Sequence, residues 1–273
     1  MASAMVRGIH LHYQVLGEMR PESPTVVFVH GIVMDNLSSW YFTVATHVSP
    51  LANVLLYDLR GHGLSERPPT GYSLDDMVLD LVGLLDSLQL GGPVYIVGNS
   101  FGGLLALAFA AAHPQRCAGL VLVDPHVGTE GFGDEMAATL GLTGEARDQK
   151  IATAFKAWLG RHSERKRNRL ADAARKLIEG TSIVPDLRST QVVDNAAIQH
   201  IRCPVLALYG ERSDLRGRGE ALLGTLSTCK IEIFNNCTHS ILWEATDAVR
   251  DRIVAFVDEH ASPASLPSPP SEP

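Results

Sequence analysis

Short runs of apolar residues recur along the chain and predict the strands of a sheet. The first run, in residues 8–16, alternates apolar and polar side chains, which is typical of a strand with one buried face. Most of the later runs are almost continuously apolar, as strands buried on both faces of a parallel sheet are. These later runs are TVVFV from Thr25, NVLLY from Asn53, VYIV from Val94, LVLV from Leu120, VLALY from Val205 and KIEIF from Lys230.

Helical patterns separate these strands. Residues 74–90 repeat apolar side chains at spacings of three and four, and Ser73 stands where a helix N-cap is expected. The Ala- and Leu-rich segment 101–113 ends before Pro114, and residues 246–260 place apolar side chains on one side. Because strand and helix alternate, the sequence predicts an α/β fold with a doubly wound, mostly parallel sheet.

One long stretch interrupts this alternation. Residues 127–200 contain several helical patterns and no convincing strand, so we expect a helical lid, or cap, inserted into the α/β core. The core is then divided between residues 1–126 and 201–260. The last residues, 261–273, hold five Pro and four Ser, and we expect a flexible tail there.

Composition narrows the class of protein. The 273 residues are 45% hydrophobic and 19% charged, which is enough apolar material for a large core and excludes disorder over most of the chain. A formal net charge of −7 argues against a nucleic-acid binder, and no apolar run is long enough for a membrane span. The four cysteines form no CxxC pair, and the first residues lack the apolar core of a signal peptide. We therefore expect a reduced, cytoplasmic protein.

The strongest chemical signal is the Gly-rich turn GNSFGG at residues 98–103. It fits the pattern G-x-S-x-G, and an apolar strand leads into it while an Ala- and Leu-rich helix leads out. So tight a turn strains the backbone at Ser100 and excludes side chains two residues to either side. The unpaired N–H groups at the start of the helix also point toward whatever lies beside Ser100. We predict that Ser100 is a nucleophile.

Candidate partners for Ser100 follow two later strands. A serine hydroxyl is a weak nucleophile, so it needs a general base, which in turn needs an acid to orient it. His239 follows the strand that begins at Lys230, and Glu211 and Asp214 follow the strand before it. Loops after parallel strands emerge at one edge of the sheet, so we expect these side chains near Ser100.

The ordered motifs resemble those of the α/β-hydrolase fold superfamily, in particular a serine-nucleophile, esterase- or thioesterase-like member with a helical lid. The resemblance covers nearly the whole chain. Its motifs are HG at 30–31, DLRGHGLS at 58–65, the turn at Ser100, the loop at 210–214 and His239. We expect a structural role for the DLRGHGLS segment, because its glycines turn the chain sharply. His62 and His126 follow strands at the same edge of the sheet, and we expect them only to line a pocket.

The resemblance also assigns a role to each candidate site residue. It implies that Ser100 is the nucleophile, that His239 is its general base and that Asp214 orients this base. The backbone N–H groups of Phe101 and Ile32 would form the oxyanion hole. Families of this kind often show Gly-x-x-Asp, and here Asp214 lies one residue further along. Asp124, at the end of the strand before the lid, and Glu211 are the alternative acids.

The function expected from these features is that of a serine hydrolase, which cleaves a carboxylic ester or thioester through an acyl-enzyme. The sequence holds no GxxxxGK[ST], no HExxH and no metal-spaced His/Cys cluster, so we expect no cofactor and no metal. The expected partner is a small-molecule acyl substrate, free or bound to a carrier. A basic run at 161–176 is either a solvated helix face or a docking patch for an acidic carrier. The oligomeric state is left open.

Three other functions stay open at this point. A carbon–carbon bond hydrolase of the ring-cleavage-product type is one, because residues 98–103 resemble the elbow of those enzymes. The loop at 31–35, GIVMD, departs from the Gly-Pro-Gly-like loop of those enzymes. The apolar side chains of the lid also favour an ester substrate. The lid positions in question are Ala152, Phe155, Trp158 and Leu159. An acyltransferase and a low-turnover binding protein are the other two, whereas epoxide hydrolases and haloalkane dehalogenases carry an Asp nucleophile in place of Ser100.

Overall fold

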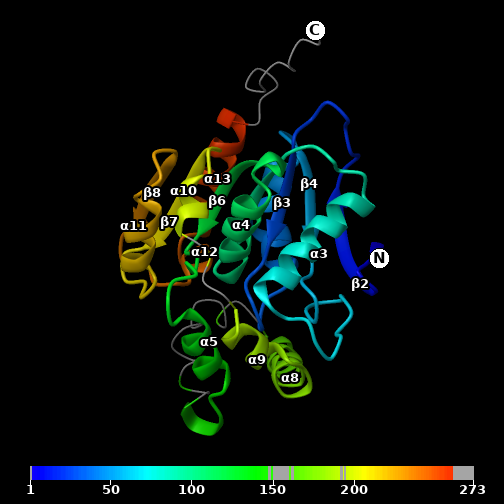
Figure 1. Cartoon of the computed structure of the whole chain (residues 1–273), viewed down its shortest axis with the longest axis vertical. Coiled ribbons are helices and arrows are strands. Elements are labelled where there is room, and N and C mark those ends of the chain that lie inside the picture. The colour runs from blue at the N-terminus through cyan, green and yellow to red at the C-terminus, as the bar shows by residue number, and fades with distance from the viewer. Residues whose placement is uncertain are drawn as a thin grey trace.

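The computed structural model describes residues 2–146, 149, 160, 163–190, 193 and 195–260. Eight strands form one sheet in the order β1-β2-β4-β3-β5-β6-β7-β8 (Figure 1). The pairs β1–β2 and β2–β4 are antiparallel, and the remaining neighbours are parallel. The strands are β1 (Ala2–Val6), β2 (Ile9–Leu16), β3 (Thr25–Val29), β4 (Asn53–Tyr57), β5 (Val94–Asn99), β6 (Cys117–Val123), β7 (Val205–Gly210) and β8 (Cys229–Phe234). The predicted α/β fold with a mostly parallel sheet is confirmed.

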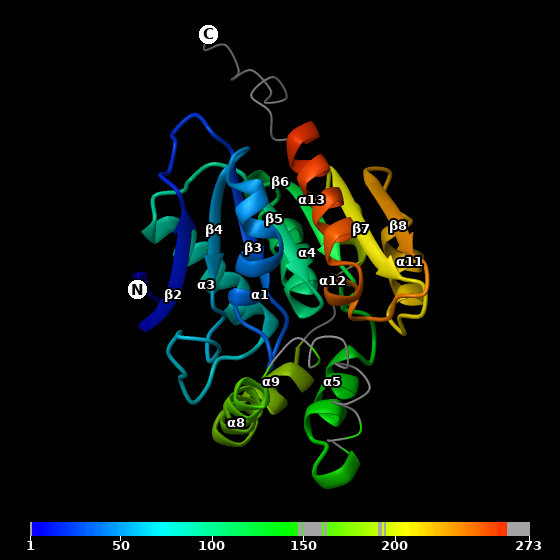
Figure 2. The ribbon, with the colours of Figure 1, turned by 180° about the vertical axis from the view of Figure 1, so that it is seen from behind.

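Helices cover both faces of this sheet (Figures 1 and 2). One face packs against α3 (Leu74–Ser87), α4 (Phe101–Ala112) and α11 (Arg216–Leu223). The other face packs against α13 (Thr246–His260), α12 (Ile241–Glu244) and a three-part segment. That segment consists of α1 (Ser38–Trp40), a π-helical turn (Tyr41–Ala45) and α2 (Thr46–Val48), and a 3-10 turn (Pro114–Arg116) precedes β6. Ser73 caps α3 as predicted, because its hydroxyl accepts the Asp76 N–H.

A helical region is inserted between β6 and β7, as the sequence predicts. It contains α5 (Phe132–Leu140), α8 (Glu164–Gly180), α9 (Ile183–Arg188) and α10 (Asn195–Gln199), and its described residues contain no strand. Helices α5, α8 and α9 lie beyond one end of the sheet in both views (Figures 1 and 2). The exact limits 127–200 stay a prediction. The four apolar lid positions and the tail at 261–273 lie outside the described residues.

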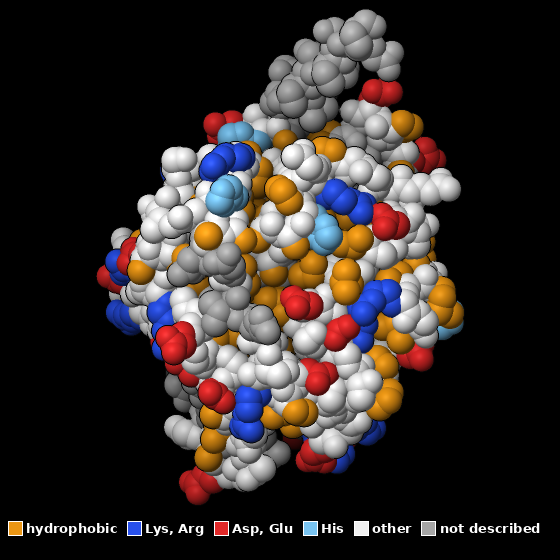
Figure 3. Space-filling model, in the orientation of Figure 1, with side chains coloured by type: hydrophobic (Ala, Val, Ile, Leu, Met, Phe, Trp, Pro, Cys, Tyr) orange, Lys and Arg blue, Asp and Glu red, His pale blue; other side chains and the backbone are white. Residues whose placement is uncertain are grey.

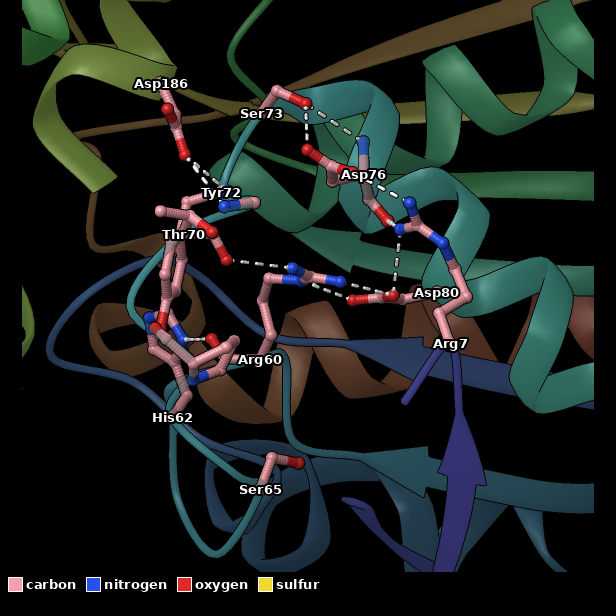
Figure 4. A network of polar contacts seen from close by, with 12 residues as sticks. Arg7, Arg60, His62, Ser65, Thr70, Tyr72, Ser73, Asp76, Asp80 and Asp186 are labelled. Carbon is pink, nitrogen blue, oxygen red and sulfur yellow. Dashed lines mark hydrogen bonds and ion pairs between the residues drawn. The ribbon is translucent and has the colours of Figure 1, made fainter. Parts of the chain in front are cut away.

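A buried ion pair fixes the loop that follows β4 (Figure 4). Arg60 donates from Nε and Nη2 to the two carboxylate oxygens of Asp80 on α3, at 2.6 Å each. Both side chains are almost fully buried, so removal of Asp80 would leave the Arg60 charge without a carboxylate partner in the core. Asp80 also accepts from Arg7 Nη1 at 3.2 Å. Nearby, the Asp186 carboxylate on α9 accepts the Tyr72 N–H at 2.7 Å, which ties the inserted region to the core.

The strand at residues 2–6, β1, was not predicted. It pairs with β2 at the edge of the sheet, and most of its side chains are exposed or half-buried, so it lacks an apolar run. In the part of the chain that is described, no helix is both long and apolar enough to cross a bilayer.

Candidate active site

Ser100 occupies a strained turn between β5 and α4. Its backbone has φ 55° and ψ −115°, in the left-handed half of conformational space that a side chain normally disfavours. A Cβ at Gly98 would lie 2.3 Å from the Gly102 carbonyl oxygen, and a Cβ at Gly102 would lie 2.4 Å from the Val29 oxygen. Only glycine fits at these two positions, which agrees with the tight turn predicted from the sequence.

His239 lies within hydrogen-bond distance of Ser100. It follows β8, and its Nε2 is 3.0 Å from the Ser100 Oγ. The loop that carries it packs closely on the end of β7, since a Cβ at Gly210 would lie 2.3 Å from the Thr238 oxygen. The sequence therefore identified the two side chains that meet here, although they stand 139 positions apart.

The carboxylate bonded to His239 is Asp124, and the prediction of Asp214 for this place is wrong. His239 Nδ1 donates to Asp124 Oδ1 at 2.9 Å, and the Asp124 side chain is fully buried. Strand β6 lies directly beside β5, and Val123 pairs with Asn99, so Asp124 emerges next to Ser100. Asp214 is exposed on the rim of the cavity described below. The other alternative, Glu211, accepts the Asn236 N–H instead.

Asp124 is one of the two alternative acids, and a sequence signal in its favour exists. Parallel strands that follow one another through a single helix usually lie side by side, so the end of β6 is the strand end nearest Ser100. The Gly-x-x-Asp spacing points instead to the loop after β7. In the structure this loop provides hydrogen-bond donors to Asp124, from Gly210 N–H at 2.8 Å and from the Ser213 hydroxyl at 2.6 Å.

Ile32 and Phe101 provide two backbone N–H groups beside Ser100. Phe101 is the first residue of α4, and Ile32 lines the same cavity as Ser100. The residues before and after Ile32 have their N–H groups engaged, Gly31 with Asp35 Oδ2 at 2.8 Å and Val33 with His62 Nε2 at 2.7 Å. Among the hydrogen bonds of the described residues, neither the Ile32 nor the Phe101 N–H has an acceptor. Two such donors can hold an anionic oxygen.

Two buried histidines hold the loop that contains Ile32. His30 Nδ1 donates to the Gly31 carbonyl, and its Nε2 accepts the Leu59 N–H at 3.0 Å. His62 Nδ1 donates to the Arg60 carbonyl, and its Nε2 accepts from Val33. Burial, together with the nearby His30, lowers the pKa of His62 to about 3. His62 is therefore neutral at neutral pH, as an acceptor of the Val33 N–H must be.

His126 lies beside the same pair. Its ring centroid is 5.8 Å from that of His239, and its backbone N–H donates to the Ser100 carbonyl at 3.2 Å. Burial, followed by the proximity of His239, lowers the pKa of His126 to about 3. It is a neutral wall of the cavity at neutral pH, in line with the pocket-lining role expected from the sequence.

A cavity of about 650 Å³ opens over Ser100 and His239. Its apolar walls come from the loop after β3, from α5, from α8 and from the turn around α12. The apolar lining residues are Ile32, Val33, Met34, Phe132, Met136, Leu140, Leu142, Ala171, Ala174, Ile178, Leu215, Leu242 and Trp243. Charged side chains lie among them: Asp35, Glu135, Asp172, Arg175, Glu179 and Asp214. The volume is in the range of small-molecule sites in proteins.

Comparison with known proteins identifies the family of this chain. A family model described as the alpha/beta hydrolase fold matches residues 24–198. The chain belongs to this family. Lipase LipV of Mycobacterium tuberculosis is 39% identical over 123 residues, which is 45% of this α/β hydrolase and 44% of the lipase. The 2-hydroxy-6-oxo-2,4-heptadienoate hydrolase of Pseudomonas putida is 38% identical over 119 residues, 42% of this chain and 41% of the relative. The matched stretch is therefore less than half the length of either relative.

A solved structure shows the same fold over nearly its whole length. A meta-cleavage product hydrolase from Pseudomonas fluorescens IP01 superimposes with a TM-score of 0.77, covering 95% of this α/β hydrolase and 98% of that chain at 24% identity. This likeness supports the fold, including the inserted helices. In the described residues, no group of three or more His, Cys, Asp or Glu side chains is arranged to hold a metal ion.

Proposed function

We propose that this α/β hydrolase is a serine hydrolase that cleaves a carboxylic ester or thioester through an acyl-enzyme. The observation that carries the proposal is the continuous chain of hydrogen bonds from Ser100 through His239 to Asp124, beside two unpaired N–H groups. The triad of the proposal is therefore Ser100, His239 and Asp124, and its oxyanion hole is formed by Phe101 and Ile32.

The geometry supports a two-step reaction. His239 Nε2 removes the Ser100 hydroxyl proton as Oγ attacks the carbonyl carbon, and the Phe101 and Ile32 N–H groups hold the resulting oxyanion. Asp124 stabilises the imidazolium through the Nδ1–H. His239 then passes the proton to the leaving alcohol or thiol. Water, activated by the same histidine, hydrolyses the acyl-serine and restores the enzyme.

Substitution of the nucleophile tests this mechanism. Ser100→Ala removes the attacking oxygen, so kcat for p-nitrophenyl butyrate is expected to fall on the order of 10⁶-fold. Thermal unfolding of the variant should stay close to that of the parent, since the methyl group fits the same turn. A variant that kept more than a few per cent of the parent's turnover would rule out Ser100 as the nucleophile.

Carbon–carbon bond hydrolysis is the second candidate, because a 2-hydroxy-6-oxo-2,4-heptadienoate hydrolase matches in sequence and a meta-cleavage product hydrolase matches in structure. That reaction expels a carbanion, which needs a proton before it can leave, whereas an ester needs only attack and collapse. A turnover panel of p-nitrophenyl esters, an acyl thioester and a vinylogous diketone acid would distinguish the two reactions. If kcat/KM for the diketone acid exceeded that of every ester and thioester by about tenfold or more, carbon–carbon bond hydrolysis would replace ester hydrolysis as the function.

Two further experiments at Ser100 test the remaining alternatives, a low-turnover binding protein and an acyltransferase. A binding protein with little turnover would fail to label at Ser100 with a fluorophosphonate, whereas the proposed nucleophile labels fully. An acyltransferase would give the acyl group to an added alcohol in preference to water, and product analysis separates these two outcomes.

A free small molecule is the substrate we propose, in preference to a carrier-bound one. In the basic run, Arg175 and Lys176 already pair with Asp172, and Asp172 is itself part of the cavity wall. On the face drawn in Figure 3, basic and acidic side chains are interspersed and no large basic patch stands out. This favours a solvated helix face over a docking patch. A reduced, cytoplasmic setting stays a prediction, which the four free cysteine thiols support.

A further inference from the structure

The end of β7 and the loop after it hydrogen-bond to the carboxylate of Asp124. The Ser213 hydroxyl donates to Asp124 Oδ1 at 2.6 Å, and this is the same oxygen that accepts the His239 Nδ1–H. The Gly210 N–H donates to the other oxygen, Oδ2, at 2.8 Å. Three donors, from the end of β7, the loop after it and the loop after β8, therefore fix the plane of one fully buried carboxylate.

Ser213 is itself held in the orientation that this contact requires. Its backbone N–H donates to the Gly210 carbonyl at 3.1 Å, which closes a tight turn after β7. Its Oγ accepts the Leu215 N–H at 3.2 Å, so the hydroxyl proton remains for Asp124. The side chain is half-buried and is not among the residues that line the cavity. Ser213 is thus placed to act on the carboxylate rather than on a substrate.

We propose that Ser213 is a positioning residue of the triad, which holds the Asp124 carboxylate in the orientation that accepts the His239 Nδ1–H. This inference rests on the proposed function. Without the hydroxyl, only Gly210 and His239 restrain the carboxylate, which can then rotate about its Cβ–Cγ bond. His239 would spend less time in the tautomer and orientation that serve Ser100, so kcat falls while substrate binding is unchanged.

Ser213 also accepts the Leu215 N–H just before α11, so it has a structural contact as well as its contact with Asp124. Three substitutions separate a structural role from a positioning role. Ser213→Ala removes both hydrogen bonds. Ser213→Thr keeps a hydroxyl for both contacts, and Ser213→Cys keeps the size of the side chain but offers only a weak donor. Ser49→Ala is the matched control, since the Ser49 hydroxyl bonds only to the Thr46 carbonyl among the described residues, away from the cavity.

The experiment is a kinetic double-mutant cycle with p-nitrophenyl butyrate. Ser213→Ala and Ser213→Cys are expected to lower kcat about ten- to a hundredfold, the effect of losing one hydrogen bond to a charged group, with KM within about twofold of the parent. Ser213→Thr and Ser49→Ala should stay within about threefold of the parent in kcat. In an Asp124→Asn background, Ser213→Ala should change kcat by less than about twofold, because Ser213 acts only through the carboxylate.

Two results would overturn the inference, and they are distinguishable from failure of the proposed triad. Unchanged kcat in Ser213→Cys, with Asp124→Asn strongly impaired, excludes a positioning role and leaves the triad intact. An equal loss from Ser213→Ala in both backgrounds shows that Ser213 acts by another route. Full activity of Asp124→Asn overturns the proposed triad, and the role of Ser213 with it.

Discussion

At the scale of single residues, the site depends on one carboxylate whose hydrogen bonds are all formed inside the protein. Asp124 is fully buried, and its own backbone N–H donates to the Leu208 carbonyl at 2.7 Å. A buried charge of this kind is tolerated only when donors surround it, and here His239, Gly210 and Ser213 provide them. The charge is thus available to stabilise an imidazolium without competition from water.

Asp124→Asn and Asp214→Asn are expected to differ sharply. The first replaces the acceptor of the His239 Nδ1–H with an amide, so the histidine is held in the wrong tautomer and kcat should fall about 10⁴-fold. The second changes an exposed side chain on the cavity rim, and kcat should stay within about tenfold of the parent. Steady-state kinetics with p-nitrophenyl butyrate measure both. The reverse ranking would return the acid to the loop after β7.

At the scale of elements, the turn between β5 and α4 sets how closely helix and sheet approach. Gly102 lies in the first turn of α4, where a side chain would meet the backbone of β3. This part of the fold could be predicted from sequence, because the glycine spacing and the flanking strand and helix all indicate one turn. The partner of His239 could not be predicted from motif spacing alone, because it depends on which strand ends lie next to each other.

Gly102→Ala tests this close approach. The new Cβ would lie 2.4 Å from a backbone oxygen that cannot move aside easily, so the free energy of unfolding should fall by about 3 kcal/mol or more. Gly180→Ala is the matched control, since α8 ends at Gly180 and a Cβ there would meet nothing within 4 Å. The control should be neutral or stabilising by up to about 1 kcal/mol. Urea unfolding gives both values, and equal stability of the two variants would contradict the packing.

At the scale of the whole molecule, the sheet has a core on each face, and α5 and α8 of the inserted region help to line the cavity over Ser100. The alternation of strands and helices in the sequence predicts this architecture, because apolar runs and amphipathic segments follow one another regularly. Strand β1 escaped prediction, since an edge strand with exposed side chains has no apolar signature. The shape of the cavity could not be predicted either, because it depends on how α5 and α8 pack over Ser100.

Global stability should depend on pH through His62. Its pKa is lowered to about 3 in the folded protein and is about 6.5 in an unfolded chain, so the unfolded state binds the proton first as pH falls. The contribution of His62 to stability is therefore fully present above pH 6.5. It is lost as the pH falls toward 3, by about 1.4 kcal/mol per pH unit. His62→Asn should reduce the slope of unfolding free energy against pH by about 1.4 kcal/mol per pH unit between about pH 6 and 4, which corresponds to one proton. An identical slope in parent and variant would count against the buried neutral histidine.

The most direct test of the central claim is to find the acyl group on the enzyme. The protein is mixed with p-nitrophenyl acetate, quenched in acid during the initial burst, digested and analysed by mass spectrometry. We predict one acetyl group on the peptide that contains Ser100, and none in Ser100→Ala treated in the same way. In Asp124→Asn the acetyl group should form far more slowly, since His239 is no longer oriented. Steady turnover of the ester with no acetyl group on Ser100 at any quench time would contradict the acyl-enzyme mechanism.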